Sequence, residues 1–329
     1  MNITRAFHRF AFCAFALVSL PLAAGAADAA KTLNVLFIGN SFTARHNLST
    51  VVKAMAEAGN PGLTFNRTDV IYGGRTLKDH WRLGTQNIVK QSTLTEAEEK
   101  ATIAALEKDV ADNPKDKYAP SALARHRELL PKIETNRQPW DIIVLQSYRD
   151  DLDGDPTPYA EFAPKFAELA KAQGARVILY ETTPATQNDK ALTTPPDPAP
   201  ILAKERAIAA LANRIDAAVA PMALVAQRCQ TQRPDLTLRF VNDAHLNQTM
   251  AYLTACTLYA ALFNQSPIGL PIDTVTDIRS QEKPAHYKTK DRDGNPITRK
   301  FNDKDRADLQ RIAWEGWSEF QKLREKSGK

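Results

Sequence analysis

The chain has 329 residues, of which 43% are hydrophobic and 25% are charged, and its formal net charge is +5. These values are typical of a soluble globular protein with one large domain, or with one domain and additions to it. The basic residues are scattered and form no stripe with aromatic ones, which argues against a surface for nucleic acid.

Residues 1–26 have the features of a signal peptide. Arg5 and Arg9 precede an apolar run over residues 10–24, and small residues occupy positions 24–26. This run is shorter than the ~20 residues that span a bilayer, and no later segment has the length and apolar character to do so. We therefore expect an exported protein, periplasmic or secreted, with an uncleaved membrane anchor as the competing interpretation.

The next 240 or so residues alternate between strand and helix patterns. Apolar or alternating stretches predict strands at residues 33–38, 63–74, 141–146, 175–181 and 221–226. Helical spacing predicts helices at residues 48–59, 161–174, 201–218 and 247–263. Strands that alternate with helices in this way predict an α/β fold with an open, mostly parallel sheet.

Two regions interrupt this alternation. Residues 85–137 are charged and helix-prone, with a capping box at Thr95 and Glu98, and we expect them to form a helical insertion within a domain over residues 27–265. Residues 266–329 form a polar extension that ends in an amphipathic helix, which we expect to dock on the domain. Within the extension, "DRDGN" (291–295) lacks the closing glutamate of a calcium loop, so Asp293-Gly294 predicts a hairpin turn.

The sequence contains no pattern that calls for a cofactor or a metal ion. The histidines lack paired spacing, and no glycine-rich phosphate loop follows the first strand. Cys13 lies in the signal segment, and Cys229 and Cys256 lack metal-ligand spacing. These last two cysteines are expected either to pair in an oxidising compartment or to remain separate buried thiols.

Polar residues gather where the predicted strands end. Ser41 follows the first strand, Gly73-Gly74 the second and Gln146-Ser147 the third, while Asp243 and His245 precede the last sheet-covering helix. The carboxyl ends of parallel strands share one edge of the sheet, where function gathers. A serine hydroxyl needs a neighbouring base such as histidine to become a nucleophile, and a carboxylate commonly orients that histidine.

Three segments resemble the SGNH (GDSL-like) hydrolase superfamily. "FIGNSFT" is similar to its first sequence block, "IYGGRTL" to its second and "VNDAHLNQTMAYLTA" to its last, in the same order over about residues 33–264. The resemblance implies a three-layer α/β/α sandwich of the flavodoxin type. It also implies Ser41 as nucleophile, His245 as general base, and the backbone of Ser41 and Gly74 as oxyanion-hole donors.

Two departures from the family leave alternatives open. The third block normally reads Gly-x-Asn-Asp, whereas this chain has "LQSYRDD", so the remaining oxyanion donor is Gln146 or Arg149. The family's aspartate lies three residues before the histidine, where this chain has Asn242. Asp243 either completes the triad instead or leaves a Ser-His dyad supported by a backbone carbonyl.

The resemblance implies hydrolysis of acyl esters, with acetyl groups on carbohydrate as the expected substrate and no cofactor. Asn40 and Arg75, beside the serine and the glycine pair, are the candidate substrate contacts. The alternatives are a non-catalytic carbohydrate-binding or scaffold protein on the same fold, and an O-acyltransferase in which an alcohol replaces water. The sequence does not distinguish hydrolysis from transfer, because the difference lies in the acceptor pocket.

Overall fold

The computed structural model describes residues 31–148, 157–182, 184–241, 243–278 and 288–327. The expected signal peptide at 1–26, Arg149 and Asn242 lie outside these ranges. Among the described residues, no helix combines the length and the apolar character that crossing a membrane requires.

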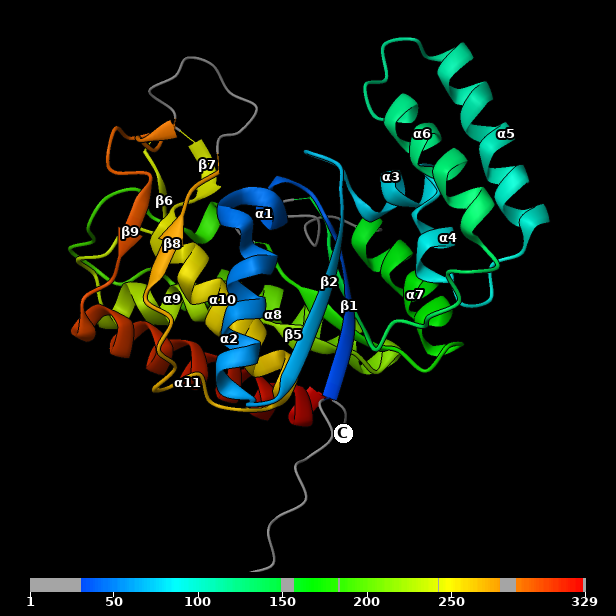
Figure 1. Ribbon diagram of the computed structural model, residues 1–329. Coiled ribbons are helices and arrows are strands. Elements are labelled where there is room, and N and C mark those ends of the chain that lie inside the picture. Colours follow the sequence, from blue (N-terminus) through cyan, green and yellow to red (C-terminus); the bar gives the residue numbers. More distant parts are fainter. Residues whose placement is uncertain (1–30, 149–156, 183, 242, 279–287, 328–329) are drawn as a thin grey trace, which may run out of the picture.

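A five-stranded parallel sheet forms the centre of the molecule (Figure 1). Its strands are β1 (Lys31–Gly39), β2 (Leu63–Ile71), β3 (Ile142–Gln146), β4 (Arg176–Tyr180) and β5 (Ala218–Ala220). Their order is β2-β1-β3-β4-β5, which is the flavodoxin-like arrangement. The predicted α/β class and parallel sheet are therefore confirmed.

Helices cover both faces of the sheet, since β1 points Val35 and Phe37 into one hydrophobic cluster and Leu36 and Ile38 into the other. The first face packs against α2 (Leu48–Gly59) and α10 (Gln248–Phe263), with α9 (Met222–Gln232) and α11 (Asp303–Ser327) beyond. The second packs against α3 (Leu77–Arg82), α4 (Thr85–Val89), α7 (Pro158–Lys171) and α8 (Pro198–Ile215). The result is a three-layer sandwich.

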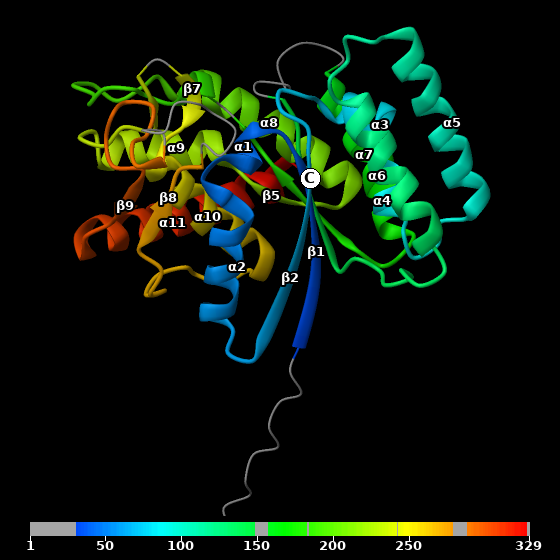
Figure 2. The ribbon, with the colours of Figure 1, turned by 45° about the horizontal axis from the view of Figure 1, so that its top comes forward.

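The segment between β2 and β3 carries the helices of the expected insertion. Besides α4 it contains α5 (Glu96–Asp112), α6 (Ala119–Leu129) and the short η2 (Leu130–Lys132). Thr95 and Glu98 form the predicted capping box at the start of α5. Figures 1 and 2 show α5 and α6 side by side at one edge of the molecule, outside α3 and α4.

The C-terminal extension packs against the rest of the chain through α11. The side chains that the helical spacing places on one face of α11 are buried: Leu309, Ile312, Ala313, Trp317 and Phe320. Before α11, β8 (Thr274–Thr276) and β9 (Thr298–Lys300) form an antiparallel pair. Cys229 and Cys256 are both free and buried, so of the two alternatives for this pair the structure has the separate thiols.

The prediction of a strand at residues 221–226 is wrong, because β5 ends at Ala220 and α9 begins at Met222. Two distant carboxylates satisfy the free amides at the start of this helix. Glu181 accepts a hydrogen bond from the backbone N–H of Ala223 (2.8 Å), and Glu205 accepts one from Leu224 (2.7 Å). A short apolar run fits either element, and here these long-range caps favour the helix.

Candidate active site

Ser41 lies at the carboxyl edge of the sheet, at the start of α1 (Ser41–Ala44). Asn40 caps this short helix, since its side-chain oxygen accepts a hydrogen bond from the backbone N–H of Phe42 (3.0 Å). The side-chain amide of Asn40 donates to the carbonyls of Arg75 (3.1 Å) and Ser147 (2.9 Å). Asn40 thus ties together the loops after β1, β2 and β3. It is fully buried, so the structure gives it this structural role in place of the predicted substrate contact.

His245 and Asp243 lie on β7 (Asp243–Leu246), which pairs with β6 (Arg239–Phe240) just before α10. The hydroxyl of Ser41 lies 2.7 Å from Nε2 of His245. Nδ1 of His245 donates to Oδ1 of Asp243, and the backbone N–H of His245 donates to the same oxygen at 3.0 Å. The structure therefore brings Ser41, His245 and Asp243 into one hydrogen-bonded chain.

The surroundings keep this chain of groups oriented and Asp243 ionised. The ring of Phe42 stacks on the imidazole of His245, with centroids 5.1 Å apart. Burial tends to raise the pKa of Asp243, but the hydrogen bonds from His245 and the charge of Arg292 outweigh it and hold that pKa well below its usual range. The side chain of His245 is 24% exposed, which leaves it accessible to a substrate.

Two arginines that the sequence did not mark as site residues lie beside Asp243. Nη2 of Arg45 lies 3.6 Å from Oδ2 of Asp243, and Arg292 forms an ion pair with the same oxygen. Arg45 belongs to η1 (Arg45–Asn47), directly after α1. No sequence motif marks either residue, since both reach Asp243 only through the tertiary fold.

His46, next in the chain, has a structural role. Its Nε2 donates to the carbonyl of Leu246 (2.8 Å), which fixes η1 against β7. Burial lowers the pKa of His46, so the ring is neutral at ordinary pH.

Two backbone N–H groups are available to stabilise an oxyanion. Within the described residues, neither the N–H of Ser41 nor that of Gly74 has a hydrogen-bond partner. Gly74 is exposed and has a φ of +67°, a conformation that glycine adopts at little cost. Ser41 follows β1 and Gly74 lies in the turn after β2, so both N–H groups stay candidate oxyanion donors.

Gln146, in contrast, is turned away from the site. Its side-chain oxygen accepts hydrogen bonds from the backbone N–H of Asn40 (2.7 Å) and the hydroxyl of Thr43 (3.0 Å). Its amide nitrogen donates to the carbonyl of Ser147, and the whole side chain is buried. Gln146 thus supports the serine loop from beneath and does not have the geometry of the predicted oxyanion donor. The alternative donor, Arg149, lies outside the described residues.

Aromatic side chains surround the glycine pair. The guanidinium of Arg75, the second predicted substrate contact, lies over the ring of Tyr118 at 4.9 Å and is partly exposed. The hydroxyl of Tyr118 donates to the carbonyl of Gly73 (2.6 Å). The ring of Tyr148, 37% exposed, is adjacent to Gly74, where an added Cβ would lie 3.9 Å from it. An open aromatic surface therefore adjoins the candidate oxyanion donor.

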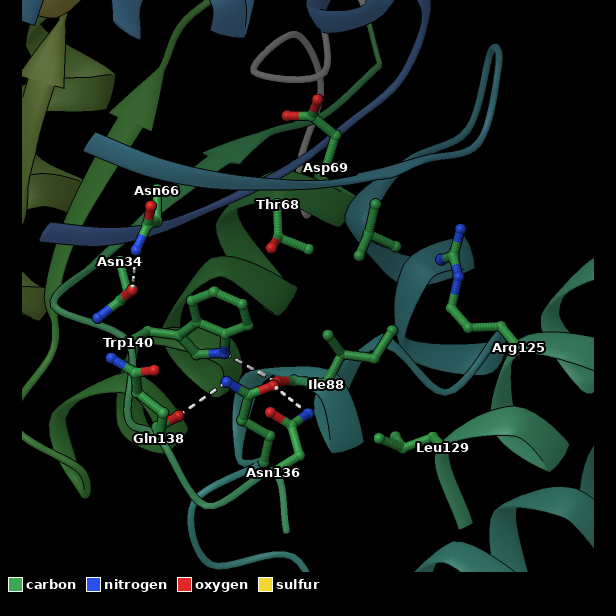
Figure 3. A pocket seen from close by; sticks show the side chains of 12 residues that line it. Asn34, Asn66, Thr68, Asp69, Ile88, Arg125, Leu129, Asn136, Gln138 and Trp140 are labelled. Atoms are coloured by element: carbon green, nitrogen blue, oxygen red, sulfur yellow. Dashed lines mark hydrogen bonds between the residues drawn. The ribbon is translucent and has the colours of Figure 1, made fainter. Parts of the chain in front are cut away.

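A separate cavity of about 350 Å³ lies between β2 and the helical insertion (Figure 3). Polar side chains and one indole line much of it: Asn34, Asn66, Thr68, Arg125, Asn136 and Trp140. Asn66 donates to Asn34 (3.1 Å), and Trp140 donates to the carbonyl of Ile88 (2.9 Å). Ser41, His245 and Asp243 do not line this cavity.

Within the described ranges, no group of three or more His, Cys, Asp or Glu residues is arranged to hold a metal ion.

Comparison with known proteins gave one match, to a solved structure. No family model matches the chain, and no curated protein matches it either. The structure is described as a "putative SGNH hydrolase from Slackia heliotrinireducens"; it is 19% identical in sequence and aligns with a TM-score of 0.43. The alignment covers 70% of this chain and 100% of that one.

Proposed function

We propose that this protein is a serine esterase of the SGNH type. The observation that carries the proposal is the 2.7 Å contact between Ser41 Oγ and His245 Nε2, with Asp243 on the other ring nitrogen. A structural serine has no need of such a partner, and a polar capping role would direct its hydroxyl to backbone amides. A nucleophile that is hydrogen-bonded to a base, which in turn is hydrogen-bonded to an orienting carboxylate, is the arrangement that serine-dependent acyl transfer uses.

In the proposed reaction, Ser41 attacks the ester carbonyl while its proton passes to Nε2 of His245. Asp243 holds the ring in the tautomer with hydrogen on Nδ1 and stabilises the imidazolium that forms. The N–H groups of Ser41 and Gly74 would bind the oxyanion, and loss of one such donor typically raises the barrier by about 3–4 kcal/mol. His245 then protonates the departing alcohol.

The second half of the reaction repeats these steps with water. His245 removes a proton from a water molecule, which attacks the acyl group on Ser41, and the carboxylic acid is released as Ser41 regains its proton. Apart from the ester and water, each step uses only groups of this chain, so the proposed reaction needs no cofactor.

We propose an acetyl ester on a carbohydrate as the substrate and an exported location. The exposed ring of Tyr148 beside Gly74 offers a face on which a sugar ring can stack. The signal-like residues 1–26 support export, and detection of the cleaved chain in the periplasm or medium tests it.

The test uses the chain from residue 27 with p-nitrophenyl acetate, beside Ser41→Ala and His245→Ala. We expect hydrolysis by the wild type and a loss of at least about 10³-fold in kcat in both variants, with unchanged circular dichroism. A serine-directed phosphonate probe should label the wild type and leave Ser41→Ala unlabelled. A wild type that neither hydrolyses the ester nor takes up the probe would contradict the proposal.

One observation favours the alternative of carbohydrate binding without catalysis, namely that the side chain of Gln146 is unavailable as a third oxyanion donor. This alternative predicts affinity for a glycan with no probe labelling. The acyltransferase alternative predicts labelling, together with transfer of the acetyl group to an added sugar faster than its release as acetate. Acetate release that is unaffected by added sugar supports the hydrolase.

A further inference from the structure

The turn at residues 291–295, in the C-terminal extension, docks directly on the hairpin that carries Asp243 and His245. One carboxylate oxygen of Asp291 accepts hydrogen bonds from the N–H groups of Asp293 (3.0 Å) and Asn295 (2.8 Å), which closes the turn. The carboxylate of Asp293 accepts the backbone N–H of Val241 at 3.0 Å. The turn is therefore attached to the connection between β6 and β7.

Arg292 lies within this docked turn and forms an ion pair with Oδ2 of Asp243. Oδ1 of the same carboxylate is occupied by the side chain and backbone of His245. The two oxygens thus have separate partners, because one faces the imidazole and the other faces arginines. Arg45 approaches Oδ2 from η1 at 3.6 Å, so guanidinium groups from opposite ends of the chain meet there.

We propose that Arg292 is a positioning residue of the esterase, which acts on His245 through Asp243; this inference rests on the proposed function. The ion pair restricts rotation of the Asp243 side chain and so fixes the direction of the imidazole. Arg292 therefore helps to hold the imidazole of His245 in line with the hydroxyl of Ser41.

Other charged or titratable groups face the same site, and a test of Arg292 has to leave them in place. From η1, Arg45 contacts Asp243 and lies 3.7 Å from Asp277, and His46 lies 3.6 Å from Asp277. From the docked turn, Asp293 is engaged with the Val241 backbone. The Arg292 variants keep all of these residues. A difference in activity between the variants and the wild type is therefore attributed to Arg292.

The decisive variants are Arg292→Met, which removes the charge, and Arg292→Lys, which keeps it. Arg306→Met is the matched control, since Arg306 lies on α11 and pairs with the exposed Asp303 (3.0 Å). We expect Arg292→Met to lower kcat by about 10- to 100-fold with little change in KM, because the base is misplaced. Arg292→Lys, which can keep the ion pair with Asp243, should recover most of the lost kcat.

NMR detection of the Nδ1 proton that His245 donates to Asp243, in the full mature chain, gives a readout that needs no turnover. We expect its far-downfield signal to be lost or broadened in Arg292→Met and to be kept in the wild type, in Arg292→Lys and in the control. The same signal in all four proteins would overturn the inference, as would an undiminished kcat in Arg292→Met. If the wild type lacks esterase activity, the proposed function fails, while the proton signal still decides whether Arg292 acts on His245.

Discussion

Gly39→Ala is the most informative single change at the serine loop, because it tests why β1 ends in Gly-Asn-Ser. An added Cβ would lie 2.4 Å from the hydroxyl oxygen of Thr43 and 2.5 Å from the side-chain oxygen of Gln146. Both side chains are buried and cannot swing into solvent. The methyl group therefore has to displace the groups that support Ser41.

The structure gives the magnitude of the effect. The oxygen of Gln146 pairs with the backbone N–H of Asn40 (2.7 Å), and its displacement leaves that buried N–H unpaired at a cost of about 1–3 kcal/mol. Overpacking adds about 1–3 kcal/mol, so the free energy of unfolding should fall by about 2–6 kcal/mol. Because Ser41 is two residues away, a shift of 1 Å in its hydroxyl should also lower kcat by about 10²-fold.

Urea unfolding measures the first quantity, and p-nitrophenyl acetate hydrolysis by the folded variant measures the second. Gly62→Ala is the control, since an added Cβ meets nothing within 4 Å there and its φ of +84° adds only local strain. We expect that control to keep its kcat. Wild-type stability and wild-type kcat in Gly39→Ala would refute the reasoning that close packing under the loop positions the nucleophile.

Three further changes test the triad, the oxyanion donor and a buried carboxyl group. Asp243→Asn should lower kcat by about 10³- to 10⁴-fold with little change in melting temperature, because the carboxylate that orients His245 is lost. Gly74→Ala should lower kcat about 10-fold in the same assay, since alanine is strained at a φ of +67° and the N–H shifts. Burial, with the nearby charge of Glu181, raises the pKa of Glu205 well above the ordinary 4.5. The protonated Glu205 carboxyl therefore contributes its full stability below pH 4.5, and this contribution is lost as the pH rises toward the folded-state pKa. In urea unfolding, Glu205→Gln should be more stable than the wild type at pH 8 and equally stable at pH 4.5.

The fold was predictable because its signals are local. Short apolar or alternating runs placed β1 to β4, and the helical spacing of buried residues placed α2, α10 and α11. The start of α9 was not predictable, because the carboxylates that cap it come from other parts of the chain: Glu181 directly follows β4, and Glu205 lies on α8. A short apolar run without its caps fits a strand equally well.

The site was predictable in its residues but only partly in its contacts. A polar residue at the end of a parallel strand is expected at the functional edge, and this placed Ser41, Gly74 and Gln146. The sequence pattern of a strand end does not specify whether a side chain there faces solvent or the neighbouring loop. The side chain of Gln146 faces the loop, where its oxygen accepts a hydrogen bond from the backbone N–H of Asn40. Arg45 and Arg292 were missed for a related reason, since ion pairs between distant segments leave no periodic signal.

The spacing of Asp243 and His245 also has a physical explanation. Both lie on β7, and residues two apart on a strand project from the same face, so a carboxylate two positions before the histidine can reach its ring. A short strand holds this geometry only if its own position is fixed. His46 fixes β7 through the carbonyl of Leu246, and Arg292 reaches it from the docked turn of the extension. The triad geometry therefore depends on both ends of the described chain, and removal of residues 266–329 should disturb the triad as well as the core under α11.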